Sequence, residues 1–458
     1  MAKARKHYVC QECGHKTWKW LGRCPGCGQW NSLVEEMEPK ISPKTPWSPG
    51  GISSPAQSID QIEPRGEDRY PTRLHEFDRV LGGGIVPGSL ILVGGDPGIG
   101  KSTLLLQVSR LVAQQEGEVL YISGEESPQQ LRLRAQRLGA LHPQLLVLAE
   151  TNVHNIQEQI NGIKPNMVVV DSIQTMFRPE LDSTPGSVSQ VRETAGLLLH
   201  MAKASQIPII LVGHVTKAGA LAGPRVLEHM VDVVCYFEGD QHAYLRILRA
   251  TKNRFGSTNE VGVFQMGSRG LEEIADPSSI FLAGRPRDVS GSVVFPCCEG
   301  SRVLLLELQA LVGPAPFGGP PRRLATGLDH NRVNMLLAVL EKRCGLALQS
   351  QDVYFNVAGG LKISEPAADL GAALAIASSF RNREVAFGTL AFGEVGLAGE
   401  VRMVNRADLR LKEGLRLGFD KFLIPQGNAE ELKDQIEMRG VAIIPVRSLQ
   451  EALDYALQ

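Results

Sequence analysis

The residues best suited to chemistry lie in one short segment, between an apolar run at 90–94 and a leucine-rich stretch that starts at residue 104. This segment fits the pattern G-x-x-x-x-G-K-[ST] and comprises Gly95, Asp96, Pro97, Gly98, Ile99, Gly100, Lys101, Ser102 and Thr103. Its glycines let backbone N–H groups wrap a phosphate, Lys101 reaches the β- and γ-phosphate oxygens, and the Ser102 hydroxyl binds Mg²⁺. Because a strand is expected before the segment and a helix after it, we predict a site for ATP and Mg²⁺.

Such a phosphate loop needs one carboxylate for the metal ion and another to orient the attacking water. Asp171 ends the apolar run MVVVD and is the candidate Mg²⁺ ligand, although an Asp that ends a strand also caps turns. The residue after Asp171 is a serine, so the second carboxylate must come from elsewhere. Glu125 follows the predicted strand at 119–123 and is favoured over the adjacent Glu126, which the sequence does not fully separate from it.

Four of the eight cysteines form two C-x-x-C pairs, each followed by glycine, near the start of the chain: Cys10, Cys13, Cys24 and Cys27. Two such turns direct four thiolates at one tetrahedral ion, which predicts a closed, structural Zn²⁺ site. A redox C-x-x-C pair and a chance cluster of reduced thiols are the alternatives. Trp18, Trp20 and Trp30 lie among basic residues and either shield a small core or contact nucleic acid or a protein partner.

Length and composition are those of a globular protein with several domains. The chain has 458 residues, of which 43% are hydrophobic and 21% charged, with a formal net charge of −1. No apolar run approaches the roughly 18 residues of a membrane span, and the first residues lack the apolar stretch of a signal peptide. We therefore expect a cytoplasmic protein without a membrane partner.

The pattern of apolar and polar segments divides the chain into four parts. Residues 1–35 form the cysteine module, and 36–58 are predicted to be a flexible linker, because twelve of the twenty residues from 39 to 58 are Pro, Gly or Ser. From 59 to 276, β-branched and leucine-rich runs alternate with helical stretches, which is typical of a parallel sheet covered by helices. A second α/β pattern occupies 277–458. The predicted fold class is α/β.

Together these segments resemble the bacterial RadA (Sms) family of DNA repair proteins, which are RecA-like ATPases. The similarity covers essentially the full length and rests on the cysteine pairs, GGDPGIGKST, YISGEES, VVDSIQT and the pentapeptide KNRFG at 252–256. RecA-like assemblies bind nucleotide between subunits, so the resemblance implies that Lys252 and Arg254 contact the γ-phosphate held by a neighbouring copy. A solvated basic loop is the alternative for these two residues.

The same resemblance assigns residues to DNA. The segment at 216–225 corresponds to the region where RecA-like proteins contact single-stranded DNA, so Lys217 and Arg225 are the expected phosphate contacts, with His214 a candidate γ-phosphate sensor. A glycine-rich loop that binds no DNA is the alternative.

Residues 277–458 resemble the proteolytic domain of Lon, which uses a serine and a lysine. In this chain Asp369 is expected at the serine position, and Asp408 or Arg410 near the lysine position, so that acyl transfer lacks a nucleophile. We therefore expect a Lon protease-like α/β domain that is proteolytically inactive and supports assembly.

The resemblance as a whole implies a DNA-dependent, helicase-like ATPase of recombinational repair. Such a protein would form a homo-oligomer, expected to be a hexameric ring, translocate on single-stranded DNA and promote branch migration of recombination intermediates beside the RecA recombinase. The alternatives are an ATP-dependent Lon-like protease and a zinc-bearing, nucleotide-switched regulator that is not a motor.

Overall fold

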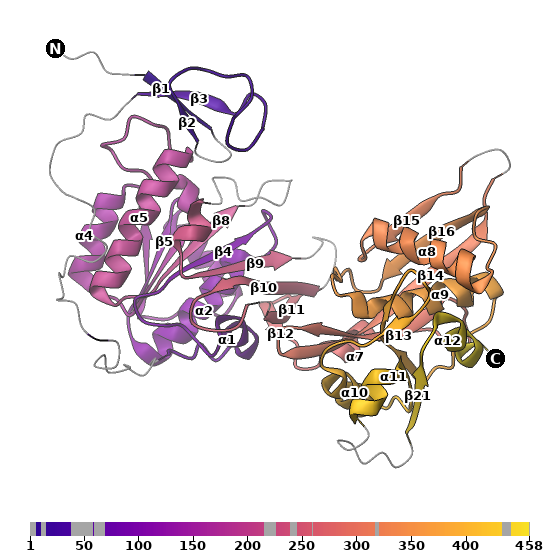
Figure 1. Ribbon diagram of the computed structural model, residues 1–458. Helices are drawn as coiled ribbons and strands as arrows, with labels where there is room; N and C mark the ends of the chain where they lie inside the picture. The colour runs from indigo at the N-terminus through magenta and orange to yellow at the C-terminus, as the bar shows by residue number, and fades with distance from the viewer. Residues whose placement is uncertain are drawn as a thin grey trace. The chain divides into compact units, whose positions relative to one another are not determined.

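The computed structural model describes residues 6–10, 15–37, 58, 69–214, 226–238, 245–258, 260–316, 320–432 and 441–457. The chain divides into two compact units, Met1–Ile274 and Ala275–Gln458, which Figure 1 shows in successive colours. Most of the predicted linker at 36–58 lies outside the described residues. Among the described helices, none combines the length and the apolar character that crossing a membrane requires.

The cysteine module is a small antiparallel sheet of three described strands in the order β2-β1-β3. These strands are β1 (Lys6–Cys10), β2 (Lys16–Thr17) and β3 (Leu33–Met37). Its buried centre consists of Cys10, Cys24 and Leu33, with Tyr8 packed against them. So small an apolar core supplies little stability by itself, which fits a module that depends on a metal ion.

The rest of the first unit is built on a sheet of nine described strands in the order β12-β11-β10-β9-β4-β8-β7-β5-β6. Strands β9, β4, β8, β7, β5 and β6 are parallel to one another. Strands β10, β11 and β12 are antiparallel to their neighbours. The bounds are β4 (Leu90–Gly95), β5 (Val119–Ser123), β6 (Leu145–Ala149), β7 (Met167–Asp171), β8 (Ile209–His214), β9 (Val233–Glu238), β10 (Leu245–Asn253), β11 (Val261–Gly267) and β12 (Gly270–Glu273).

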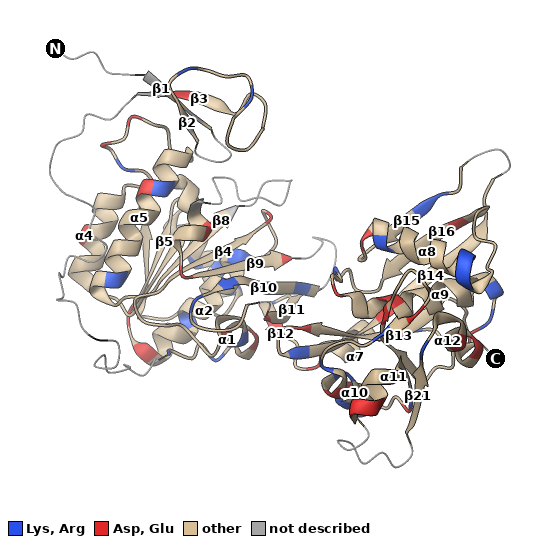
Figure 2. Cartoon of the chain, in the orientation of Figure 1, with Lys and Arg blue, Asp and Glu red and all other residues tan. Residues whose placement is uncertain are grey.

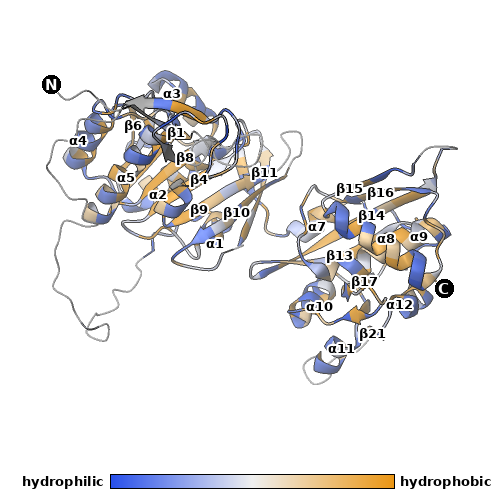
Figure 3. Cartoon of the chain, turned by 45° about the horizontal axis from the view of Figure 1, so that its top comes forward, coloured by the Kyte–Doolittle hydropathy of each residue, from blue (hydrophilic) through white to orange (hydrophobic). Residues whose placement is uncertain are grey.

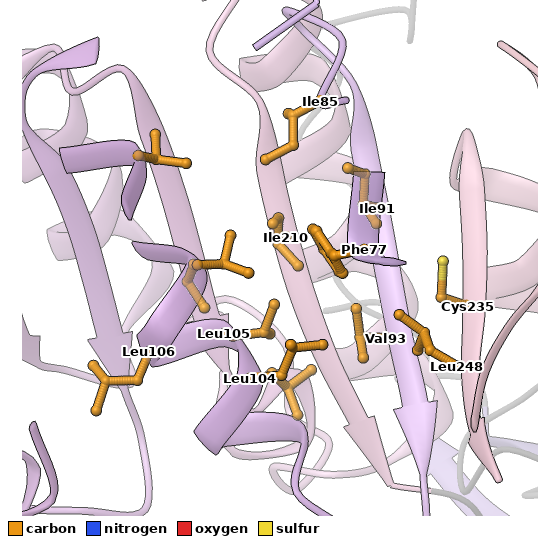
Figure 4. Packing of buried hydrophobic residues seen from close by; sticks show 14 of the residues in the cluster. Phe77, Ile85, Ile91, Val93, Leu104, Leu105, Leu106, Ile210, Cys235 and Leu248 are labelled. Carbon is orange, nitrogen blue, oxygen red and sulfur yellow. The ribbon is translucent and has the colours of Figure 1, made fainter. Parts of the chain in front are cut away.

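Helices cover both faces of this sheet because alternate side chains of each strand point to opposite sides. Ile91 and Val93 of β4 pack with Phe77 and Leu104 in one hydrophobic cluster (Figure 4), while Leu90 and Leu92 belong to the cluster on the other face. The first face carries α1 (His75–Leu81), α2 (Lys101–Glu116) and α3 (Pro128–Arg137). The second carries α4 (Val153–Ile163), α5 (Val188–Ser205) and α6 (Val226–Met230).

The second unit contains a sheet of seven described strands in the order β15-β16-β14-β13-β17-β20-β21. They are β13 (Ser292–Glu299), β14 (Arg302–Pro314), β15 (Arg323–Thr326), β16 (Gln351–Val357), β17 (Thr389–Ala391), β20 (Lys421–Pro425) and β21 (Ala442–Val446), and β18 (Glu394–Val395) pairs separately with β19 (Val401–Arg402). The helices are α7 (Pro277–Phe281), α8 (His330–Cys344), α9 (Asp369–Arg381), α10 (Ala407–Arg416), α11 (Gln426–Leu432) and α12 (Leu449–Ala456).

Helix α9 is buried over most of its length and packs along β13 and β14. In both units the strands are largely apolar, as the orange colour in Figure 3 shows, and most charged residues lie on helices and loops (Figure 2). The predicted α/β class, with a parallel-sheet nucleotide-binding core, an N-terminal cysteine cluster and a second sheet unit, is confirmed.

Candidate functional site

The predicted phosphate loop joins the end of β4 to the start of α2, with Gly95 the last strand residue and Lys101 the first helical one. Gly95, Gly98 and Gly100 have φ values of 150°, 78° and 120°, a region that side chains rarely adopt. A Cβ atom on Gly95 would also lie 2.9 Å from the Cβ of Phe237. The glycines are therefore required by the backbone path of the loop. Ser102 and Thr103 lie partly buried in the first turn of α2.

Lys101 is held inside this loop. Its side chain is 4% exposed, and Nζ donates to the carbonyl oxygens of Gly95 at 2.7 Å and Asp96 at 2.9 Å. Burial lowers the pKa of the ammonium, and nearby carboxylates oppose this shift, in the order Asp171, Asp96 and Glu125. The structure thus brings the lysine and both predicted catalytic carboxylates to one edge of the sheet.

Asp171 ends β7 next to Ser123 of β5 and accepts a 2.6 Å hydrogen bond from the Tyr121 hydroxyl. Tyr121 is fully buried, and its pKa is raised well above the usual value by burial and by the negative charge of Asp171. The phenol therefore stays a neutral donor. It orients the carboxylate without cancelling its charge, which suits a Mg²⁺ ligand.

The two adjacent glutamates have different partners. Glu125 accepts a 2.8 Å hydrogen bond from the buried Ser172 hydroxyl, whereas Glu126 forms an ion pair with Arg134 of α3. Burial raises the pKa of Glu126 and the Arg134 guanidinium opposes that shift. Glu125 is the exposed member of the two. This arrangement supports Glu125 as the group that orients water, since Glu126 is already committed to the Arg134 cation.

Besides Tyr121 and Ser172, sequence reasoning missed Arg246 at this edge of the sheet. Arg246 of β10 is 4% exposed, and its Nε donates to the carbonyl oxygen of Ile99 at 3.1 Å. The guanidinium thus braces the phosphate loop from a residue 147 positions further along the chain. The sequence does not mark Arg246, because Arg249 and Lys252 lie in the same strand. A buried arginine is recognised only when its partner in the fold is known.

Lys252 and Arg254 lie at the opposite edge of the sheet. Asn253 pairs with Val233, which is aligned with Ile91, while the phosphate loop begins at Gly95. Four residue steps of about 3.3 Å therefore separate the two edges by roughly 13 Å along the strands. Neither cation reaches the phosphate loop of its own chain, so any contact with a γ-phosphate requires a second copy.

The two cations also differ from each other. The Lys252 ammonium donates to the carbonyl oxygens of Glu228, His229 and Val231 at 2.7, 3.3 and 2.8 Å. Burial lowers its pKa, and the neighbouring Arg254 charge adds to the shift. The Arg254 side chain, in contrast, is 55% exposed and pairs with Asp232 at 3.2 Å. Arg254 is thus the more accessible of the two cations to a ligand of another copy.

Three of the predicted zinc ligands converge. The sulfur atoms of Cys10, Cys24 and Cys27 lie within 4.8 Å of one another, and those of Cys10 and Cys27 are 3.6 Å apart. Tetrahedral Zn–S bonds of about 2.3 Å place sulfurs roughly 3.8 Å apart, so this donor set fits Zn²⁺. Cys13, the fourth predicted ligand, lies outside the described residues.

The three tryptophans of this module do not shield its core. Trp18, Trp20 and Trp30 are 67%, 55% and 69% exposed. The Arg23 guanidinium lies over the Trp30 ring, 6.0 Å from its centroid. Of the two roles left open by the sequence, core shielding is therefore wrong for these residues.

The predicted DNA contacts Lys217 and Arg225 lie outside the described residues, as does the side chain of His214. In the second unit, Asp369 starts α9, is 1% exposed, and accepts hydrogen bonds from Arg332 and from the Val395 amide. Burial raises the Asp369 pKa, and both donors oppose the shift. This carboxyl is occupied by internal partners.

The two candidates for the lysine position of Lon differ in burial. Arg410 is 2% exposed and forms an ion pair with Glu365, while Asp408 is half-buried and pairs with Lys412 at 3.4 Å. The partners of Asp369 come instead from Arg332 and the backbone of Val395. Asp369, Arg410 and Asp408, the residues expected near the catalytic positions of Lon, are thus all in ion pairs.

Comparison with known proteins shows the family to which the chain belongs. A family model for an AAA domain matches residues 60–220, and a model for a rubredoxin metal binding domain matches residues 8–35. The chain is 53% identical over 460 residues to the DNA repair protein RadA of Halalkalibacterium halodurans and 52% identical over 467 residues to that of Bacillus subtilis, with 100% of both chains covered in each pair. The chain belongs to the RadA family of DNA repair proteins.

The RadA of Listeria monocytogenes is also similar, at 50% identity over 459 residues and 100% coverage of both chains. The family resemblance inferred from the sequence is thus confirmed. RadA membership and the AAA domain together indicate an ATPase that binds a nucleotide with Mg²⁺, and the rubredoxin-type match and the cysteine cluster support zinc binding.

Proposed function

We propose that this RadA-family chain is a DNA-dependent ATPase of recombinational DNA repair. The observation that carries the proposal is the convergence of Lys101, Glu125 and Asp171 at the edge of the sheet where the phosphate loop lies. These are the three kinds of group that phosphoryl transfer to water needs: a cation for the phosphates, a metal ligand and a water-orienting carboxylate.

In this proposal the loop from Gly95 to Thr103 binds the triphosphate through backbone amides and Lys101. Ser102 and Asp171 hold Mg²⁺, which neutralises charge on the β- and γ-phosphates. The Glu125 carboxylate accepts a hydrogen bond from the attacking water and aligns it with the γ-phosphorus. The hydroxyls of Tyr121 and Ser172 position the two carboxylates by donating hydrogen bonds to them.

The active form is an oligomer, expected to be a hexameric ring, in which Arg254 and Lys252 of one copy meet the γ-phosphate bound by the next. Support comes from their position at the edge of the sheet away from the phosphate loop of the same chain. Positive charge supplied there would stabilise the transition state as charge develops on the leaving oxygen. Arg254 needs little rearrangement for this contact, whereas Lys252 would first have to leave three backbone carbonyls.

The substrate of the motor is single-stranded DNA, with Lys217 and Arg225 as phosphate contacts. Turnover would drive helicase-like translocation and branch migration of recombination intermediates, with RecA as the protein partner. The support for this part is the name DNA repair protein carried by relatives that cover the whole chain. The described residues of the second unit do not favour the protease alternative, because Asp369, expected at the serine position, is a buried, ion-paired carboxyl.

The test is the ATPase rate of the full chain with and without single-stranded DNA, together with the mass of the assembly under the same conditions. We expect DNA to raise the rate, and Lys101→Ala to lower it by more than about 100-fold while circular dichroism stays unchanged. A rate that DNA does not alter, with nucleotide-dependent binding of another protein, would favour the non-motor regulator instead. Degradation of an unfolded protein that Asp369→Ala does not affect would favour the protease.

A further inference from the structure

The exposed Arg254 is anchored by a carboxylate that is itself buried. Asp232, which immediately precedes β9, is 1% exposed, and its Oδ1 accepts from Nη1 of Arg254 at 3.2 Å. The backbone N–H of Arg254 also donates to the carbonyl oxygen of Asp232 at 3.1 Å. A guanidinium has five N–H donors in a fixed plane, so this one side-chain contact leaves others available for a phosphate.

Asp232 is fixed in turn by the start of β4. Its Oδ2 accepts from the Leu90 amide at 3.0 Å and from the Lys203 ammonium at 2.8 Å, and its own N–H donates to the Leu90 carbonyl oxygen at 2.9 Å. The carboxylate is therefore anchored to the first residue of β4, the strand that ends in the phosphate loop. Its position does not depend on Arg254.

The backbone around Arg254 is held by other residues. Asn253 Nδ2 donates to the Leu81 carbonyl oxygen at 3.1 Å, and its Oδ1 accepts from the Phe255 amide at 2.9 Å. Loss of the Asp232 charge should thus leave the pentapeptide in place. What changes is the freedom of the Arg254 side chain.

We propose that Asp232 is a positioning residue: it holds the Arg254 guanidinium in the orientation from which this group meets the γ-phosphate bound by the next copy. The inference rests on the proposed contact between copies. An unrestrained arginine samples many rotamers, and ordering it during each turnover has an entropic cost. An ion pair with a buried, fixed carboxylate removes most of that freedom beforehand.

The first test is a double-mutant cycle on kcat with Asp232→Asn and Arg254→Ala. Asn keeps the size of the side chain and an acceptor for Leu90, but removes the charge. We expect D232N to lower kcat about tenfold or more, with the KM for ATP unchanged, and the double variant to be no slower than R254A. Additive losses in the double variant would overturn the inference, because Asp232 would then act independently of Arg254.

Lys203→Met provides the matched control, since Lys203 binds the other oxygen of the same carboxylate and lies over the Phe255 ring, but is not proposed to meet the γ-phosphate. We expect K203M to lower the melting temperature and to change kcat less than about twofold. A loss of kcat as large as that of D232N would show that the buried charge network, rather than the orientation of Arg254, sets turnover. That result would overturn the inference.

Mixed assemblies separate this inference from the proposed function and also detect misfolding. K101A copies lack a working phosphate loop but supply an intact Arg254, so mixing them with R254A copies should restore turnover at about a quarter of the interfaces of a random, equal mixture. D232N copies should be restored to the same degree. Failure of the R254A mixture would overturn the contact between copies; restoration of R254A but not of D232N would overturn only the role of Asp232.

Discussion

The two carboxyls of the candidate nucleotide site and two carboxyls of the second unit have different kinds of partner. In the first unit Asp171 and Glu125 accept hydrogen bonds from the neutral hydroxyls of Tyr121 and Ser172. In the second unit Asp369 and Glu365 form ion pairs with arginines, Arg332 and Arg410. A hydroxyl orients a carboxylate and leaves its negative charge in place, whereas a guanidinium neutralises it.

This difference separates a site prepared for a ligand from one that is complete without it. A carboxylate held by a hydroxyl keeps the charge that a divalent cation or a polarised water requires. The ion pairs of the second unit contribute to the fold only while both partners are present, because removing one leaves the other charge uncompensated.

Glu125→Gln should lower the ATP turnover of the full chain by about 10²–10⁴-fold, since the amide cannot accept a proton from water. Nucleotide binding should be retained. Glu126→Gln is the matched control and should lower turnover less than about tenfold, because Glu126 is already paired with Arg134. Steady-state turnover and nucleotide titration of both variants check this; a larger loss in E126Q would reverse the assignment of the two glutamates.

Asp369→Ala should destabilise the second unit by about 1–3 kcal/mol, because it removes the buried acceptor of the Val395 amide and the ion-pair partner of Arg332. Hydrogen exchange of α9 in increasing urea measures this change within the full chain. The Asp408 side chain is 36% exposed in its pair with Lys412, so Asp408→Asn should lower the free energy of unfolding by less than about 1 kcal/mol. Equal effects of the two variants would mean that burial does not strengthen the pair between Asp369 and Arg332.

Tyr121→Phe should raise the Mg²⁺ concentration needed for half-maximal turnover by about 10–100-fold, as expected when a residue that orients a metal ligand is lost. The protein should remain folded, because the ring and its packing are preserved. A Mg²⁺ titration of the ATPase rate checks the result. No change in the Mg²⁺ requirement would argue against Asp171 as the metal ligand.

The ion pair between Asp276 and Arg416 is more exposed to solvent than the pair between Asp369 and Arg332. Hydrogen bonds from Arg416 and Ser279 hold the pKa of Asp276 at about 2, below the usual 3.8, although its side chain is 35% exposed. A depressed pKa contributes stability above about pH 4 that is lost as the pH falls through about 2. Asp276→Asn should therefore cost less than about 1 kcal/mol at pH 7, and the difference from wild type in urea unfolding should shrink below pH 4. A difference that is constant with pH would contradict this.

The sequence predicted those parts of the site that are local in the chain. The phosphate loop is one continuous segment, and the strands before Glu125 and Asp171 could be recognised from their own residues. The contacts that favour Glu125 over Glu126 could not be predicted, because Ser172 and Arg134 come from other elements. The proposed contact of Lys252 and Arg254 with a nucleotide of another copy was predicted from family resemblance alone.

Residues that act through distant partners could not be predicted. Asp232 and Arg246 carry no motif: Asp232 is fixed by the Leu90 amide, and Arg246 donates to the Ile99 carbonyl oxygen, which are partners 142 and 147 residues away. The tryptophans of the cysteine module show a related difficulty, because an aromatic side chain suits a core and a contact surface equally well. Only their exposure in the fold decides between the two.

The central claim is that each nucleotide site is completed by Arg254 of another copy. Nucleotide affinity and ATP turnover of R254A, measured on one preparation, test it most directly. We predict that the dissociation constant for ATP stays within about threefold of the wild-type value while turnover falls by about 10³-fold or more. An equal loss of affinity and turnover, or unchanged turnover, would contradict the account.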